Sequence, residues 1–164
     1  MPFAPFFSIG LMGPILGAAE ELLEQVTAGA HTKGISYFDF DRQIDSATAL
    51  EAIGECALRI DTARLHVHRA AHELQETTKH QLLDFTTRAR CRADAGHAAE
   101  NLRRAADLLM SVAGTSAFAS SSRLQRYWRD INVSSRHAFL NSRPLYEAYG
   151  RAYANVEPNI TRYI

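Results

Sequence analysis

Residues 88–100 read RARCRADAGHAAE, residues 113–118 read AGTSAF, and residues 124–130 and 135–138 read LQRYWRD and SRHA. Alanine and glycine dominate the first run, so it predicts a helix that approaches a neighbouring helix closely. The glycine and hydroxyl residues from Gly114 to Ser122 stop that helix, and the serines before Arg123 can cap another one. This order of helix, polar turn and helix favours antiparallel helices packed side by side.

Two further helices are predicted upstream from apolar periodicity. The first runs from about Gly13 to Ala28, and Pro14 suits its first turn, where a missing N–H costs nothing. Residues 29–45 are predicted to be a loop, and a second helix begins near Asp45 or Ser46. The stripe of that second helix predicts the seam of a bundle: Leu50, Ile53, Ala57, Ile60, Val67, Ala71 and Leu74, interrupted by Arg64, which is expected to reach Asp61 or a carboxylate on a facing helix.

The remaining chain predicts two more helices and an ordered tail. After a break at Thr77 to His80, a third helix runs from about Gln81 to Val112, and a fourth from about Arg123 to Leu140, with Pro144 ending that segment. The tail contains four tyrosines and is expected to pack back on the bundle: Tyr146, Tyr149, Tyr153 and Tyr163. We therefore predict one all-α domain over residues 1–164, an antiparallel four-helix bundle.

The charge balance bears on the class of partner. Lys+Arg and Asp+Glu both number 18, so the net charge is zero and neither nucleic acid nor a membrane surface is an expected partner.

The first nineteen residues carry no charge, but no Lys or Arg precedes them and prolines and glycines interrupt them. This segment is therefore expected to bury against a helix or another subunit rather than to act as a signal or membrane span. Cys56 and Cys91 are predicted to be free thiols in a reducing cytoplasm.

His137 is the strongest candidate for chemistry. Ser134 precedes it by three residues, and Arg126 and Asp130 lie within three turns, so a titratable ring has hydroxyl and charged neighbours. The alternative, which spacing alone favours, is a histidine satisfied in a polar seam of the bundle. Trp128 is likewise either a packing anchor or a surface for stacking.

Two histidine sets have spacing that can hold a metal. His68, His72 and Glu76 share one helix face, and Asp94 and His97 have the carboxylate-x-x-His spacing of di-iron bundles. A di-iron site requires two such motifs and further carboxylates, and we find one motif. No metal is expected.

Taken together and in order, these segments resemble the C-terminal helical domain of the acyl-CoA dehydrogenase fold. The runs PILGAA at 14–19, RIDTARL at 59–65 and RAA at 69–71 fit its first two helices. The segments 128–130 (WRD) and 135–138 (SRHA) are most similar to those of the two-component flavin-dependent (group D) monooxygenases.

The resemblance implies a function and a set of site residues. In that family, reduced flavin (FMN or FAD) from a separate reductase reacts with oxygen, and an aromatic or polyketide-like molecule is oxygenated. His137 matches a histidine beside the flavin ring that holds or relays a proton, and Arg129 and Asp130 are further catalytic candidates. The cofactor-binding candidates are Gly114, Thr115 and Ser116, whose turn reaches the flavin of an adjacent subunit in the wider fold, and Trp128.

The resemblance also implies partners. The family's N-terminal helical and middle β-domains are absent from these 164 residues, so we expect a partner chain that supplies them, a flavin reductase and a homo-oligomer. Leu50 stands where the family pattern has a glutamine. Two alternatives stay open: a cofactor-free tailoring enzyme that uses His137, Arg129 or Asp130 on a small apolar metabolite, and a non-catalytic oligomerisation or scaffold protein.

Overall fold

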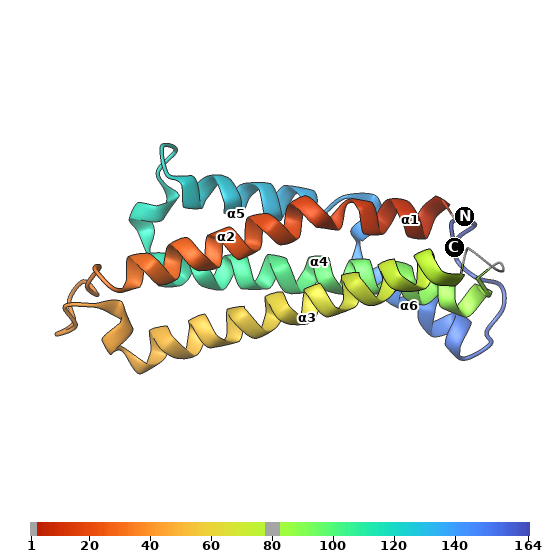
Figure 1. Ribbon diagram of the computed structural model, residues 1–164, viewed down its shortest axis with the longest axis horizontal. Helices are drawn as coiled ribbons and strands as arrows, with labels where there is room; N and C mark the ends of the chain where they lie inside the picture. The colour runs from red at the N-terminus through yellow and green to blue at the C-terminus, as the bar shows by residue number, and fades with distance from the viewer. Residues whose placement is uncertain (1–2, 78–82) are drawn as a thin grey trace.

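In the computed structural model, residues 3–77 and 83–164 are described, and they form an all-α bundle. Four long helices run along one axis in alternating directions: α2 (Met12–Ala30), α3 (Ala47–Thr77), α4 (Phe85–Ala113) and α5 (Arg123–Ser134) (Figure 1). The described residues contain no strand, only one isolated bridge between Ile35 and Phe40. The predicted fold class is confirmed.

Five further elements complete the fold. α1 (Phe3–Gly10) continues the line of α2, and α6 (Ser142–Tyr153) packs against the first half of α4 (Figure 1). Three 3₁₀ turns are η1 (Gln43–Asp45), η2 (Thr115–Phe118) and η3 (Ala138–Leu140). One end of the bundle carries the α2–α3 and α4–α5 connections, and both chain termini lie at the other end (Figure 1).

The central helix is α4, which contacts all five other α-helices. Its buried positions are largely alanine, and Gly96 lies where α6 crosses it. A Cβ at Gly96 would lie 2.8 Å from Leu145 Cδ1 and 3.2 Å from the Cα of Ser142. The close helix approach predicted from the Ala/Gly run is therefore confirmed, and α6 is the helix that uses it.

The predicted stripe of α3 is right in part. Ile60 and Leu74 are buried, but Leu50 is 52% exposed. Two small residues that the predicted stripe left out, Cys56 and Ala63, are fully buried, because small side chains allow α3 to approach α4 closely. The Cys56 thiol donates to the carbonyl of Ala105 on α4 (3.4 Å). The prediction for Arg64, the polar residue that interrupts the stripe, is confirmed. Its guanidinium binds Glu20 on α2 (2.7 Å) and Asp61 (2.5 Å).

The uncharged N-terminus is helical, which the sequence analysis did not predict before Gly13. α1 and α2 bury Ala4, Met12 and Ile15 among others, although Phe3 and Phe6 remain exposed. By length and composition alone the stretch Phe3–Ala30 could cross a bilayer, but core helices and signal sequences pass the same test. Pro14 lies in the first turn of α2, as predicted.

The prediction for the last part of the chain is wrong in its boundaries. The fourth helix ends at Ser134 rather than Leu140, and Pro144 does not end a segment, because it lies in the first turn of α6, where proline is tolerated. The aromatic tail does pack back on the bundle: Tyr146, Tyr149 and Tyr153 lie on α6, and Tyr163, beyond that helix, contacts Arg92 through its carbonyl and Phe139 through its ring. At the start of α4, the Asp84 side chain accepts from the Thr87 amide; the predicted start at Gln81 and most of the predicted break lie outside the described residues.

Both cysteines are free, as predicted, and the structure shows that both are buried. Burial raises the pKa of the Cys56 thiol to about 11 and that of Cys91 to about 12. Neither thiol is therefore an activated nucleophile.

Candidate functional site

His137 lies in the connection between α5 and α6, not on the long helix where it was predicted. It holds the N-cap position of η3, and the Phe139 amide donates to its Nδ1 (3.2 Å). Because Nδ1 accepts this bond, the ring proton of the neutral imidazole is assigned to Nε2. The side chain is exposed, so it is neither sealed in a dry seam nor enclosed in a cavity.

Aromatic side chains surround this imidazole. The ring centroids of Phe7 and Phe139 lie 6.0 Å and 5.9 Å from that of His137, and Phe3 stacks on Phe7 at 5.7 Å. Phe3 and Phe7 are partly open to solvent. His137 thus borders an apolar surface formed by α1 and η3, which is suited to contact a planar ring or another polypeptide segment.

The turn after α4 carries three of the predicted cofactor residues. Gly114 has a φ of +77° and ends α4, and η2 begins directly at Thr115. The first backbone bond of η2 runs from the Ala117 amide to the Gly114 carbonyl (3.0 Å), so the amides of Thr115 and Ser116 precede it. Such amides at a helix start are donors for an anion.

Lys33 joins this turn from the α2–α3 loop. Its ammonium donates to the Ala113 carbonyl and to the Ser116 hydroxyl (3.0 Å). Gln43 follows in the same loop, and its amide donates to the Val112 carbonyl (2.7 Å). Sequence spacing could not reveal this arrangement, because the loop and the turn are about eighty residues apart. Lys33 and Gln43 line a cavity of about 210 Å³ with Ser116.

Trp128 is held by packing rather than presented to solvent. Its indole N–H donates to Asp107 (2.7 Å) on α4, and its ring meets Phe118 edge to face at 5.4 Å. Arg129 and Asp130 are exposed and form an ion pair with each other (3.0 Å). The roles of all three in catalysis or cofactor binding stay predictions.

The structure divides the predicted site residues into two groups. The turn Gly114–Ser116 lies before α5, and His137 lies beyond its other end. A helix of 12 residues spans about 18 Å, so the two groups cannot contact the same few atoms of a ligand.

The two residue sets that have metal-ligand spacing do not assemble. Over residues 3–77 and 83–164, no three His, Cys, Asp or Glu side chains converge on one point. Buried Asp94 binds Arg69 and His66 Nδ1 (2.7 Å to the histidine), and His97 Nδ1 instead lies 2.8 Å from the Tyr146 hydroxyl. Burial, and then the charge of His66, lower the pKa of His97. His66, which faces α4, is a residue that the sequence analysis missed in favour of exposed His68 and His72.

Comparison with known proteins gives a family match over most of the chain. Residues 9–142 match the model of the acyl-CoA dehydrogenase C-terminal domain. The p-hydroxyphenylacetate 3-hydroxylase oxygenase component of Acinetobacter baumannii is 26% identical over 98% of this chain and 38% of that protein. The flavin-dependent monooxygenase oxygenase subunit HsaA of Mycobacterium tuberculosis is 24% identical over 98% of this chain and 41% of that protein.

A solved structure is similar to this chain over nearly all of its length. XiaF from a Streptomyces species, in complex with FADH2 and glycerol, superposes with a TM-score of 0.92 and 33% identity, over 98% of this chain and 41% of that chain. The present chain therefore spans about two fifths of the length of these relatives. Because nearly all of this chain matches only about two fifths of each relative, the similarity concerns one part of those larger proteins.

Proposed function

This chain belongs to the acyl-CoA dehydrogenase C-terminal domain family, and on that premise we propose that it acts as the helical domain of a flavin-dependent monooxygenase. Its substrate would be an aromatic or polyketide-like small molecule. The observation that carries the proposal is the likeness to XiaF, whose structure holds FADH2, across nearly all of this chain.

The turn residues fit the phosphate of a flavin. Lys33 supplies a positive charge, Ser116 a hydroxyl, and the amides of Thr115 and Ser116 point from the start of η2. Phosphate oxygens accept from all of these donors. The cavity of about 210 Å³ is smaller than the ~300–1,000 Å³ typical of whole-ligand sites, so this end would hold only part of the cofactor.

His137 fits a different task. Its Nε2–H is free of the cap bond to Phe139, and the neighbouring Phe7 can exclude water from one side of the ring. A flavin in its reduced form, when bound, supplies the electrons that activate oxygen. His137 would then hold or relay one proton at the reacting centre, a task that suits an imidazole near neutral pH.

We propose that more than one chain contributes to the site. The full length of α5 lies between the turn and His137, so we infer that one subunit's turn serves the flavin beside another subunit's His137. The apolar surface at Phe3 and Phe6 fits a further contact. We propose a homo-oligomer, a polypeptide that supplies the remaining domains of the relatives, and a separate flavin reductase.

A flavin titration tests the proposal. The purified chain, alone and mixed with a candidate partner chain, would be titrated with oxidised and reduced FMN and FAD while flavin absorbance and fluorescence are recorded. We expect binding in at least one mixture, and about tenfold weaker binding for Lys33→Met, the loss of one charge-assisted contact. Arg162→Gln, in the C-terminal tail, should bind as the unaltered chain does.

Two outcomes would overturn the proposal. One is the absence of flavin binding in every mixture, which would leave the oligomerisation role. The other is equal binding by the unaltered chain and Lys33→Met, which would show that the turn does not hold the flavin phosphate.

A further inference from the structure

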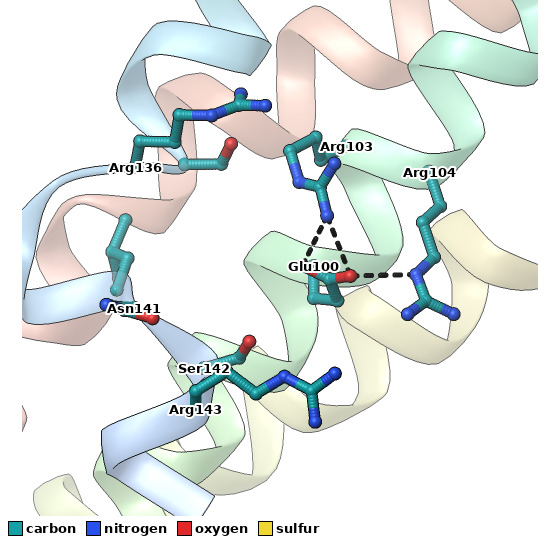
Figure 2. A pocket seen from close by; sticks show the side chains of 9 residues that line it. Glu100, Arg103, Arg104, Arg136, Asn141, Ser142 and Arg143 are labelled. Atoms are coloured by element: carbon teal, nitrogen blue, oxygen red, sulfur yellow. Dashed lines mark hydrogen bonds and ion pairs between the residues drawn. The ribbon is translucent and has the colours of Figure 1, made fainter.

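A second cavity, of about 590 Å³, lies between α4, the α5–η3 connection and the start of α6 (Figure 2). We call it the arginine pocket, and its wall includes Glu100, Arg103, Arg104, Arg136, Ser142 and Arg143. Its volume is in the range that holds a whole small molecule. The proposed flavin contacts at the turn do not use it.

The wall carries a surplus of positive charge in a chain whose net charge is zero. Four arginines face a single carboxylate, that of Glu100. Arg103 and Arg104 both bind Glu100, at 2.7 Å and 2.8 Å, and Arg103 also lies 3.8 Å from Asp107. Burial alone would raise the pKa of Glu100, but the two guanidinium groups outweigh it and lower that pKa. Glu100 is thus ionised and shared, and cannot neutralise all four arginines.

Arg136 and Arg143 have no carboxylate partner within the described residues. The Arg136 guanidinium donates to the backbone carbonyl and the side-chain amide oxygen (2.8 Å) of Asn132, which are neutral groups. In Figure 2 the two side chains extend from opposite sides of the opening, towards the side on which Arg103 and Glu100 lie. Their charges are therefore available to an anion in the pocket.

Ser142 adds a second, independent sign of a ligand. The residue is only 8% exposed, its hydroxyl has no hydrogen-bond partner in the described part of the chain, and Figure 2 shows it directed into the pocket. The N-cap of α6, Asn141, makes no side-chain cap bond, so the first amides of α6 also lack a cap there. Because this hydroxyl makes no bond within the described residues and opens on the pocket, it is available to a ligand there.

We propose that the arginine pocket binds the diphosphate group of a small molecule. Guanidinium groups match phosphate oxygens two bonds at a time, and the start of α6 favours negative charge. A diphosphate carries enough charge to offset the surplus in the wall. A smaller cavity of about 140 Å³, lined also by His97 and Tyr146, shares Glu100 and Arg143 with the pocket, so there is room for an organic group beyond the phosphates.

The ligand could be free pyrophosphate or a nucleoside diphosphate, and calorimetry distinguishes them. The purified chain would be titrated with pyrophosphate, ADP and orthophosphate at ~50 mM salt, where exposed charges are weakly screened. We expect pyrophosphate to bind more tightly than orthophosphate. If the organic group enters the smaller cavity, ADP binds more tightly than pyrophosphate, and Tyr146→Ala removes that gain; equal binding of the two identifies the free anion.

Three variants locate the site. Arg136→Gln/Arg143→Gln should weaken pyrophosphate binding about tenfold or more, since each change removes charge-assisted bonds. Both side chains are exposed, so the melting temperature should not change. Arg126→Gln removes an exposed arginine outside the pocket and should bind as the unaltered chain does. Lys33→Met removes the cation of the turn, and in that background the double arginine variant should still lose binding, which separates the pocket from the turn.

The proposal is overturned if pyrophosphate does not bind, or if the double variant binds it unchanged. It is also overturned if Arg126→Gln weakens binding equally, which would indicate nonspecific attraction. Loss of binding in Lys33→Met alone would assign the phosphate to the turn. None of these results depends on flavin binding, so this proposal and the proposed function can fail separately.

Discussion

The two ends of α5 are built by different means. At the turn end, the groups that could meet a ligand are fixed by backbone: Gly114 has a positive φ, and the Lys33 ammonium is held by a carbonyl and a hydroxyl. At the other end, His137, Arg136 and Arg143 are exposed side chains, and the two arginines have no carboxylate partner among residues 3–77 and 83–164. The groups of the first end are bound to other groups of this chain, whereas those of the second end are open to solvent.

The largest expected effect is on chemistry at the second end. His137→Gln should lower product formation by about 100-fold or more, as loss of a proton-transfer group does, while flavin affinity and the melting temperature stay unchanged. The measurement is hydroxylated product formed per reduced flavin consumed, with the reductase and the polypeptide that completes the enzyme present. Glu24→Gln, exposed on α2, serves as the control for a general effect of surface charge. An unchanged product yield in His137→Gln would assign this end to packing alone.

The next effect tests whether close packing sets the position of the second end. Gly96→Ala places a methyl group 3.2 Å from the Cα of Ser142, so α6 must shift, at a cost of about 2–3 kcal/mol in the free energy of unfolding. Gly54→Ala on α3 meets no atom within 4 Å and should be neutral or stabilising. Denaturant unfolding of both variants measures this difference. Equal stability of the two would mean that α6 does not depend on the small residue.

The corresponding change at the turn end is smaller. Gly114→Ala forces a side chain into a backbone conformation that L residues rarely adopt, which costs about 1–2 kcal/mol. Because the turn is defined by backbone, we expect flavin binding to weaken with it, although no ligand-binding side chain is removed. Urea unfolding and the flavin titration described above measure the two effects. If Gly114→Ala lowers the free energy of unfolding but leaves flavin affinity unchanged, flavin binding does not depend on this backbone conformation.

The two ends also differ in how far sequence could predict them. The AGTS turn and the Ala/Gly run are local patterns, so the helix end at Gly114 and the close approach at Gly96 were predicted correctly. Lys33 joins the turn only through tertiary structure, and the end of α5 at Ser134 follows no strong breaker in the sequence. Pro144 was misread because proline is equally compatible with a helix stop and with a first turn.

The arginine pocket shows the same limit for side chains. Its residues come from α4, from the α5–η3 connection and from α6, and each arginine alone resembles an ordinary solvated residue. Spacing instead drew attention to His68 and His72, which face outward, whereas His66 binds the buried Asp94. Periodicity identifies faces of a helix, but which face meets which neighbour is decided by packing between small residues such as Ala63 and Gly96.

The smallest effect concerns the start of α4, which lies at the end of the bundle where α6 packs. Asp84 accepts from the side chain and the amide of Thr87 (2.7 Å and 2.9 Å), and these bonds lower the pKa of its carboxyl below the ordinary 3.8. A carboxyl with a lowered folded pKa contributes stability above its unfolded pKa and loses it as the pH falls through the folded pKa. Asp84→Ala should therefore cost about 1 kcal/mol at neutral pH, the usual value of an N-cap, and nothing once the carboxyl is protonated in strong acid.

Unfolding by urea at pH 7, 5 and 3 measures this dependence, with Asp39→Ala in the α2–α3 loop as the control carboxylate. A cost that does not decrease at all between pH 7 and pH 3 would mean that Asp84 acts through packing rather than through its charge. The result also bears on the comparison of the two ends. If the Asp84 cap stabilises this part of α4, then α6 packs against a helix that is ordered without any ligand. The exposed arginines beside α6 are then positioned before a ligand binds.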